Sequence, residues 1–420
     1  MTSAYQRHTY NRWLIACVLA VSTALNYLDR QTLSILIVTI QREIHLTDRQ
    51  YSLMTTGFVA SYTLMTALAG VALDRVGVRR GLSWAVALWS AACALHAVCK
   101  NAVQMAAARL LLGLGESANF PAGVKGIAEI FPVEERALAV AIFNSGSSFG
   151  AALGVPLIAW LGVRYGWRVC FLATGLVGFL WLALFLLVYP RLNRRSVSAE
   201  AKPARAIDSS TERFGEPRPR LISLLARRRS WGCFAARIFI DPVTYFLIFW
   251  VPKFLQDQHG FTLQQLGRLL WAPYLLMAIG TLVGGWLPEL MVHRGKTINY
   301  SRKLIMGVCS VMILGSAFVI ASQSSRLVIL VALGALMFCH GSWGNITLPA
   351  ESFRGQIIGT IAGLGGLLGG IAGIVGQYML GDIIPRYGYR QIFLIAGCLY
   401  SLAFLMVCIC IPRLGEMSDE

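Results

Sequence analysis

Long apolar runs separated by short polar stretches dominate the chain. Twelve of these runs have about the 20 residues that an α-helix needs to cross a bilayer. Backbone polar groups in lipid must be hydrogen-bonded within the spanning structure, and no run alternates with the period of two that barrel strands require. The pattern therefore predicts an all-α integral membrane protein with twelve transmembrane helices. The predicted spans are 13–40, 51–73, 81–99, 102–124, 137–163, 167–189, 231–256, 269–291, 304–324, 327–350, 355–381 and 391–411.

One polar stretch is far longer than the others. Residues 190–230 hold four prolines, eleven Lys or Arg and four Asp or Glu. A segment of this composition has no need to fold and is typical of a linker. Because it leaves six spans on either side, the sequence predicts two pseudo-symmetric six-helix bundles, residues 1–189 and 231–420, joined by a basic linker.

The charge balance fits a membrane protein better than a soluble one. Only 14% of the 420 residues are charged, whereas AVILMFWYC make up 56%; soluble domains carry about 25% charge. This argues against soluble enzymes and nucleic-acid-binding modules, although the net charge is +17. Of the 37 Lys and Arg, 24 lie in segments on the same side as the N-terminus and the linker. The positive-inside rule then predicts that both termini and the linker are cytoplasmic.

The two predicted halves share a motif and a glycine pattern. An acid four residues after a glycine, followed by basic residues, occurs in 70–80 and again in 285–295. Glycines also recur at spacings near four in 137–163 and 355–381, which lets neighbouring helices approach closely. Two related halves are what a rocking transporter with alternating access requires.

Six charged residues lie more than four residues from either end of a predicted span, where a charge costs on the order of a few kcal/mol and is a candidate for function. They are Asp29, Arg30, Arg109, Glu116, Arg237 and Asp241. Arg30 shares a helix face with Asn26 and follows Tyr27 by three residues, so its guanidinium is predicted to hold a carboxylate in the cavity. The alternative is that Arg30 only neutralises the nearby acids.

The intramembrane acids are candidates for proton transfer. Burial and nearby arginines act in opposite directions on Asp29 and Glu116, which would let either exchange a proton near neutral pH. Permanent ion pairs between helices are the alternative. Arg109 lies seven residues before Glu116 on the same helix face and is expected to tune it. Arg237 and Asp241 are four residues apart and are expected to pair along their helix.

Several motifs resemble those of the major facilitator superfamily. GVALDRVGVRR at 70–80 is similar to the superfamily motif between the second and third helices, and 109–116 is similar to its fourth-helix motif. Within that superfamily, 26–30, 115–121 and 131–136 resemble the anion:cation symporters. The resemblance covers nearly the whole chain.

Two stretches of the second half, 241–253 and 340–347, are similar to the hexuronate branch of these symporters, which imports galacturonate and glucuronate with protons. The resemblance implies proton-coupled uptake, with charged residues after the second helix latching the halves together. The expected substrate-binding residues are Asn26, Tyr27, Arg30, Tyr62, Ser147, Tyr245, His340, Trp343, Asn345 and Thr347. The expected proton-coupling residues are Asp29, Arg109 and Glu116, and the expected gating residues are Asp74, Arg75 and Arg79.

Taken together, the sequence predicts a proton-coupled symporter for a hexuronate in a bacterial inner membrane. It is expected to work as a monomer in the lipid bilayer, with no cofactor, metal or nucleic acid. The alternatives are an anion exchanger of the same fold and a transporter for another small carboxylate, such as an aldonate or aldarate. A membrane enzyme is less consistent, because the six His are scattered without ligand spacing and no HExxH or GxSxG motif occurs. A receptor that binds without transport would be told apart by uptake into proteoliposomes.

Overall fold

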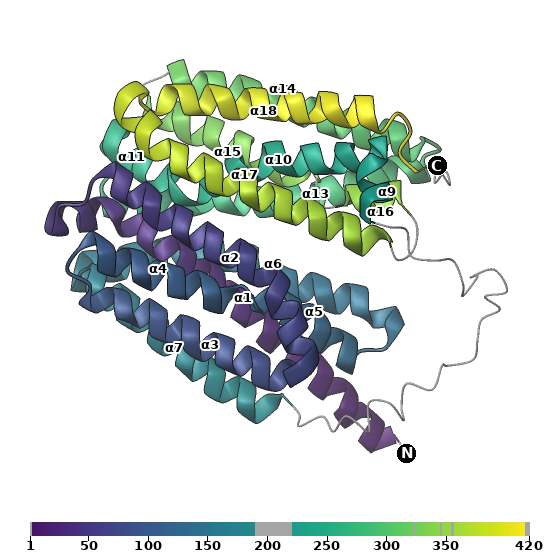
Figure 1. Cartoon of the computed structure of the whole chain (residues 1–420), viewed down its shortest axis with the longest axis horizontal. Coiled ribbons are helices and arrows are strands. Elements are labelled where there is room, and N and C mark those ends of the chain that lie inside the picture. Colours follow the sequence, from purple (N-terminus) through teal and green to yellow (C-terminus); the bar gives the residue numbers. More distant parts are fainter. Residues whose placement is uncertain (1, 190–220, 323–324, 345–346, 354–356, 416–420) are drawn as a thin grey trace.

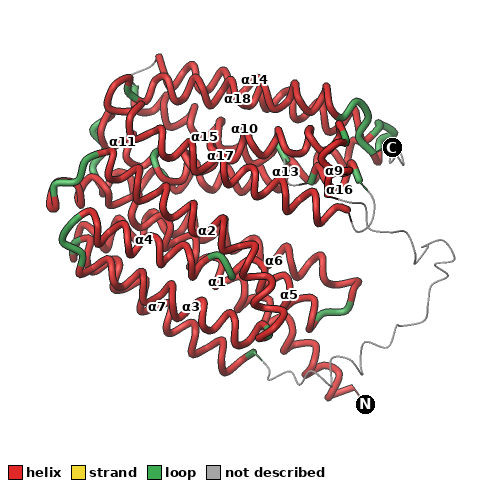
Figure 2. Tube along the Cα trace, in the orientation of Figure 1, coloured by secondary structure: helices red, strands yellow, loops and turns green. Residues whose placement is uncertain are grey.

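A computed structural model describes residues 2–189, 221–322, 325–344, 347–353 and 357–415. Over these ranges every regular element is a helix (Figures 1 and 2). The helices form twelve long segments, six before residue 190 and six after residue 220. The all-α fold predicted from the apolar runs is therefore confirmed.

The first six segments form the half drawn from purple to teal in Figure 1. The predicted span 102–124 is broken here, because one helix ends at Glu116 and the next begins at Asn119. The helices are α1 (Thr2–Ile44), α2 (Asp48–Val76), α3 (Val78–Leu95), the short η1 (His96–Val98), α4 (Ala102–Glu116), α5 (Asn119–Ile130), α6 (Val133–Tyr165) and α7 (Trp167–Val188).

The second six segments contain three similar breaks. In these three breaks and in the one between α4 and α5, a proline occupies one of the first three positions of the helix that follows. Proline has no backbone N–H to donate, so it interrupts a continuous helix but is tolerated in the first turn of a new one. The helices are α9 (Leu221–Ala226), α10 (Arg228–Phe249), α11 (Val251–His259), α12 (Leu263–Leu269), α13 (Trp271–His293), α14 (Ile298–Ser322), α15 (Arg326–Ser342), α16 (Leu348–Ser352), α17 (Ile357–Tyr387) and α18 (Tyr389–Cys410).

The segment between the halves is partly helical. Residues 190–220 lie outside the described residues, but α9 and the first residues of α10 fall inside the range 190–230 that was expected to be linker. Helix α9 has the sequence LISLLA, which is apolar enough to pack. Helix α10 begins at Arg228, three residues before the boundary expected at 231.

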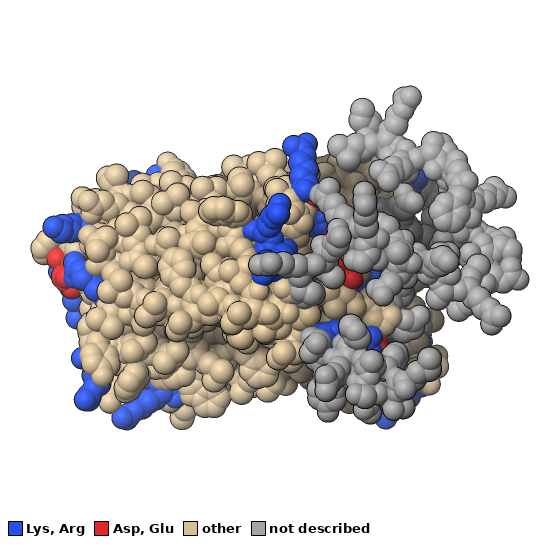
Figure 3. All heavy atoms as spheres, turned by 90° about the horizontal axis from the view of Figure 1, so that it is seen from below, with Lys and Arg blue, Asp and Glu red and all other residues tan. Residues whose placement is uncertain are grey.

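The exposed surface is that of a membrane protein. Eight helices among the described residues are long and apolar enough to cross a membrane, or nine if the bent α2 counts as one span. Helices α4 and α15 fall short because the breaks limit them to 15 and 17 residues, and polar residues lower the hydropathy of α1. Figure 3 shows a broad band of uncharged residues on one face, with Lys and Arg gathered to either side.

The two halves repeat the same helix packing. In the first half α1 packs on α6, α2 on α4, and α3 on α7. In the second half α10 packs on α17, α13 on α15, and α14 on α18. Numbered within each half, these are the same three pairs of segments, which supports the internal repeat seen in the sequence.

The halves meet at the end of the molecule that carries α11, here called the α11 end. The labelled N- and C-termini lie at the opposite end, here called the termini end (Figure 1). At the α11 end, Arg49 Nη1 donates to Asp382 Oδ2 at 2.9 Å. The buried Lys253 Nζ lies 3.0 Å from Asp48 Oδ1. Both ion pairs join one half to the other.

Helix α17 shows how far this contact extends. A Cβ added at Gly381 would lie 2.6 Å from the side chain of Ser52, and one at Gly370 would lie 2.4 Å from Thr63, both on α2. A Cβ at Gly363 would meet nothing within 4 Å. The two halves are therefore in close contact at the α11 end and separate toward the termini end.

Two glycines of α6 allow it to touch the backbone of α1. A Cβ at Gly146 would lie 2.0 Å from the carbonyl oxygen of Ala20, and one at Gly150 would lie 2.2 Å from that of Ala24. Because backbone atoms cannot give way as a flexible side chain can, only glycine fits at these positions. The close approach predicted from the glycine spacing is confirmed for this pair of helices.

The substitution Gly150→Ala is expected to lower the free energy of unfolding by about 1–3 kcal/mol, because the methyl group overpacks the contact between α1 and α6. Gly315→Ala is the matched control, since a Cβ there meets nothing within 4 Å; it should be neutral or stabilising by up to about 1 kcal/mol. Thermal unfolding of the purified variants in detergent measures both. Equal midpoints for the two variants would contradict the close approach.

Candidate functional site

A buried ion pair joins α1 to the end of α4. The Nε of Arg30 donates to Oε2 of Glu116 at 2.6 Å. Arg30 is 6% exposed and Glu116 is fully buried. The other oxygen of Glu116, Oε1, has no hydrogen-bond partner among the described residues. Because Glu116 is the last residue of α4, the break before α5 helps to place its carboxylate at this point.

Aromatic rings surround the guanidinium of Arg30. Its Cζ lies 4.3 Å from the ring centroid of Tyr62, 5.0 Å from that of Tyr27 and 5.5 Å from that of Phe58. Ring faces attract a cation, and this attraction is strongest where water is excluded. Tyr27 and Tyr62, both predicted for the site, are thus gathered around Arg30 together with Phe58, which sequence reasoning missed.

Arg109 supports the same cluster from α4. It is 1% exposed, and its Nη2 donates to the backbone carbonyl of Arg30 at 3.4 Å. Its Nε and Nη1 are buried without a hydrogen-bond partner among the described residues. Arg109 therefore contacts the backbone of α1 and adds a second positive charge close to Glu116.

The carboxyl group of Asp29 points from α1 toward α3 and α7. Its Oδ1 accepts a hydrogen bond from the thiol of Cys93 on α3 at 3.3 Å, and that thiol lies 3.1 Å from the hydroxyl of Thr174 on α7. Oδ2 is buried without a partner among the described residues. The structure thus places Asp29 between α1, α3 and α7, and does not bring it into hydrogen-bond contact with Arg30.

An amide ties α5 to α1 about two turns before Arg30 along α1. Asn119 Oδ1 accepts from Ser22 at 2.8 Å, and Asn119 Nδ2 donates to Thr23 at 3.1 Å. Asn26 is buried, and its Nδ2 lacks a partner within the described structure. Sequence reasoning did not single out Asn119. The usable signal was Pro121 two residues later, which marks the break between α4 and α5.

The second half carries an ion pair of its own. Arg237 Nη2 lies 2.9 Å from Asp241 Oδ2, so the predicted pairing along the helix is confirmed. Helix α17 leaves room for it, because a Cβ at Gly369 would lie 2.1 Å from Oδ2 of Asp241. The glycines of α17 therefore serve the packing of a charged pair as well as that of the helices.

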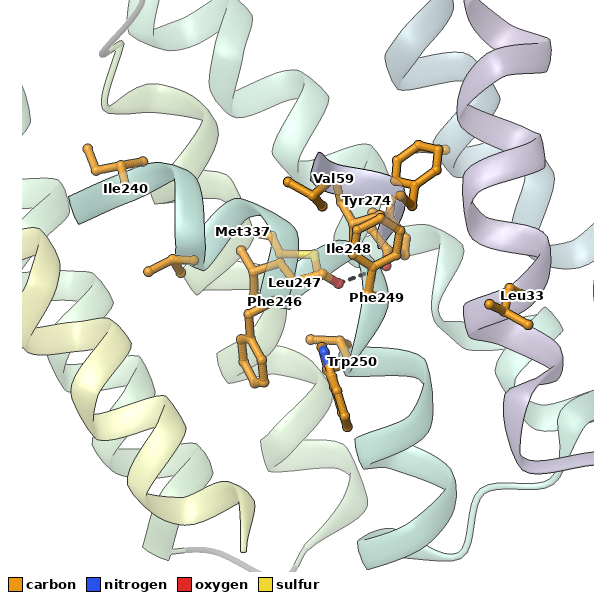
Figure 4. Packing of buried hydrophobic residues seen from close by; sticks show 14 of the residues in the cluster. Leu33, Val59, Ile240, Phe246, Leu247, Ile248, Phe249, Trp250, Tyr274 and Met337 are labelled. Carbon is orange, nitrogen blue, oxygen red and sulfur yellow. Dashed lines mark hydrogen bonds between the residues drawn. The ribbon is translucent and has the colours of Figure 1, made fainter. Parts of the chain in front are cut away.

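A row of aromatic rings connects the two halves beside Arg30. The Phe58 ring lies 6.0 Å from Tyr62 on α2 and 5.8 Å from Phe249 on α10, and Phe249 stacks on Tyr245 at 6.2 Å. In Figure 4, Phe249 leaves α10 on the side where Val59 of α2 lies, and Phe246 leaves in another direction. Tyr245 is thereby placed at the interface, next to the cluster around Arg30.

Other predicted substrate residues lie elsewhere. Trp343 is 2% exposed and donates to Ser310 on α14 at 2.9 Å, and the His340 ring is hydrogen-bonded to Tyr400 on α18. Both side chains thus face helices of their own half. Ser147 bonds the backbone of Asn144 at 2.7 Å and Thr347 that of Gly344 at 3.0 Å, while Asn345 lies outside the described residues.

The predicted gating residues lie at the termini end. Asp74 Oδ1 accepts from Lys125 Nζ at 2.5 Å. Arg79 donates to the backbone oxygens of Leu186 and Tyr189 at 2.6 and 3.1 Å, which caps the end of α7. These bonds stay within the first half; Arg75 lies beside Asp74 at the end of α2. A latch to the second half would need a rearrangement at this end.

The described residues form two sets of six long helical segments that meet around a buried charged cluster, an arrangement typical of multi-pass membrane transporters. Residues 19–377 match the family model of the Major Facilitator Superfamily. The chain belongs to this superfamily of transporters, as the motifs in the first half indicated.

Two relatives and one solved structure illustrate the match. The chain is 27% identical over 401 residues to the hexuronate transporter of Escherichia coli (strain K12), covering 94% of this chain and 93% of that protein. It is 30% identical over 308 residues to the galacturonate transporter of Dickeya chrysanthemi, covering 72% and 89%. The inward-facing, unoccupied bacterial homologue of the human lysosomal transporter Spinster aligns with a TM-score of 0.74 at 18% identity, over 95% of this chain and 98% of that one. This structural similarity shows that the two chains share the same fold.

A double-mutant cycle tests the buried pair. Arg30→Met leaves Glu116 without its cation and is expected to lower the free energy of unfolding by about 3–5 kcal/mol, and adding Glu116→Met should recover most of that loss. The control Arg12→Met breaks the partly exposed pair between Arg12 and Glu135 (2.8 Å) and should cost less than about 1 kcal/mol. Unfolding in detergent measures Arg30→Met, Glu116→Met, the double variant and the control Arg12→Met. A double variant whose loss of stability equals the sum of the two single losses would show that the two side chains act independently.

Proposed function

We propose that this protein is a proton-coupled symporter that imports a sugar acid, most specifically a hexuronate, by alternating access. The observation that carries the proposal is the buried pair of Arg30 and Glu116 at 2.6 Å, ringed by aromatic side chains. The names of the relatives, a hexuronate and a galacturonate transporter, support the substrate class.

In the proposed mechanism the substrate carboxylate replaces Glu116 as the partner of Arg30. Only Nε is engaged in the hydrogen bond to Glu116, and a guanidinium can bind a carboxylate through two parallel N–H groups. Tyr27 and Tyr62 lie against the guanidinium, where their rings can stack on the apolar face of a sugar and their hydroxyls can bond its oxygens. Tyr245 completes this site from the second half.

Glu116 links substrate binding to a proton in this mechanism. When Glu116 takes up a proton it loses the charge that holds Arg30, so the guanidinium becomes free for the substrate anion. Its Oε1, buried without a partner among the described residues, is a site for that proton. Asp29 is a candidate for a second proton, because a buried carboxyl group with one oxygen that has no hydrogen-bond partner among the described residues is best accommodated in its neutral form.

Alternating access fits the positions of the interdomain contacts. The ion pairs between the halves lie at the α11 end, where they would close one entrance. The positive-inside rule places the termini end in the cytoplasm, so this conformation would face inward. In the outward-facing state, Asp74 and its neighbours Arg75 and Arg79 would form the latch at the cytoplasmic side.

An anion exchanger of the same fold, or a transporter for an aldonate or aldarate, would use the same arginine. Exchange requires substrate on the opposite side of the membrane, whereas symport requires a proton gradient. Uptake into proteoliposomes with and without an imposed pH gradient, and with and without internal substrate, separates these two modes. Competition among hexuronates, aldonates and aldarates then ranks the substrates.

Glu116→Gln should abolish accumulation driven by a proton gradient and leave exchange of preloaded substrate partly intact, because the amide keeps the size and hydrogen bonding of the acid but cannot titrate. Glu135→Gln, which removes an acid paired with Arg12 near the termini end, is the matched control and should accumulate substrate normally. Labelled glucuronate uptake into proteoliposomes measures both. Normal accumulation by Glu116→Gln would remove this residue from the coupling step.

Arg30→Lys should weaken uptake severely, since lysine keeps the charge but loses the planar fork. The lost interaction is about 1.5–3 kcal/mol, or roughly tenfold to a hundredfold in apparent affinity. Arg12→Lys is the control and should transport normally.

In the unmutated protein glucuronate should inhibit uptake, whereas glucose, which lacks the carboxylate, should not. Equal inhibition by the two sugars, or normal transport by Arg30→Lys, would refute Arg30 as the carboxylate anchor.

A further inference from the structure

A cleft at the α11 end is lined by residues of both halves. Its volume is about 490 Å³. Helix α6 of the first half contributes one continuous face, and α12 of the second half contributes another. The lining residues are Pro156, Ala159, Trp160, Val163 and Arg164 from α6, and Gln264, Gly267 and Arg268 from α12.

The two helices touch directly at the base of this cleft. A Cβ at Gly267 would lie 2.6 Å from the Cβ of Ala159, so glycine is what allows α12 to lie on α6. A Cβ at Gly162 would lie 3.1 Å from the side chain of Leu263. The cleft therefore exists only while the two halves are in contact at the α11 end.

The lining of the cleft is partly apolar and partly positively charged. Pro156, Ala159 and Val163 make part of the lining apolar, and Arg164 and Arg268 contribute one arginine from each half. Among the described residues that line it there is no acid, so these two positive charges are not balanced within the cleft. Charge complementarity therefore favours an anion that carries an apolar portion.

The surroundings show that the cleft opens toward lipid. Leu153 and Leu157, on the same helix toward the middle of the membrane, are 64% and 45% exposed. Trp160 at the cleft and Trp271 just beyond α12 are also exposed, at 57% and 40%. Exposed Trp and Arg next to exposed Leu are typical of the membrane–water interface, where lipid headgroups lie.

We propose that this cleft binds one anionic phospholipid. Its phosphate would lie between Arg164 and Arg268, and one acyl chain would lie along the face of α6 formed by Pro156, Trp160 and Val163. Because the two arginines belong to different halves, the lipid bridges them and stabilises the conformation closed at the α11 end. A ligand that binds one conformation better than the other shifts the population toward it.

Native mass spectrometry of the full chain in detergent tests binding, with phosphatidylglycerol and phosphatidylcholine of identical acyl chains as probes. The unmutated protein should prefer phosphatidylglycerol by at least about tenfold, given two arginines at the headgroup. Arg164→Gln/Arg268→Gln should remove that preference, and Arg164→Lys should keep most of it. Arg386→Gln/Arg390→Gln, which removes two exposed charges at the ends of α17 and α18, is the matched control and should bind like the unmutated protein.

Three outcomes would overturn the site: equal binding of the two lipids, unchanged binding by the Arg164/Arg268 variant, or displacement of the lipid by millimolar inorganic phosphate. The last would indicate a site for a free anion. Hydrogen–deuterium exchange tests the bridging. Phosphatidylglycerol should slow exchange in α12 of the unmutated protein but not of the double variant, and unchanged exchange would refute stabilisation of the closed end.

Discussion

A permanently charged guanidinium buried among membrane helices is the constraint on which the centre of this protein depends. Arg30 cannot lose its proton, so the fold has to supply a counterion, and Glu116 does so from the last position of α4. The rings of Tyr62 and Phe58 on α2 cover the same guanidinium. Arg30 thereby sets how α2 and α4 face α1. In the proposed mechanism a substrate carboxylate competes with Glu116 for the guanidinium of Arg30.

Close contact between helices holds each half together around these buried charged side chains. Gly146 and Gly150 let α6 lie against the backbone of α1, and Gly369 leaves space for the carboxylate of Asp241. Lipid provides no hydrophobic force that drives helices together, so packing of this kind holds each half. The same reasoning applies between the halves, where Gly370 and Gly381 bring α17 against α2 at one end only.

The two halves share their helix packing but differ in chemistry. The first half gathers two acids and two arginines around α1, and the two acids have different hydrogen-bond partners. The second half contributes a self-contained pair and a row of aromatic rings that reaches Phe58. In the proposed transport cycle the first half therefore carries the charge changes, and the second half closes the site around the sugar.

The sequence by itself determined the helical fold and singled out Arg30 and Glu116 as candidates for function. Apolar length leaves a membrane chain few alternatives to the helix, and charges inside spans are rare enough to stand out. The sequence could also have shown the helix breaks before α5, α11, α13 and α16, because a proline follows each of them. Only the tertiary structure decided that Asp29 turns toward Cys93, that Trp343 packs on Ser310, and that Phe58 meets Phe249. Residues next to one another on a helix point in different directions, and which neighbour each one meets depends on how the helices pack.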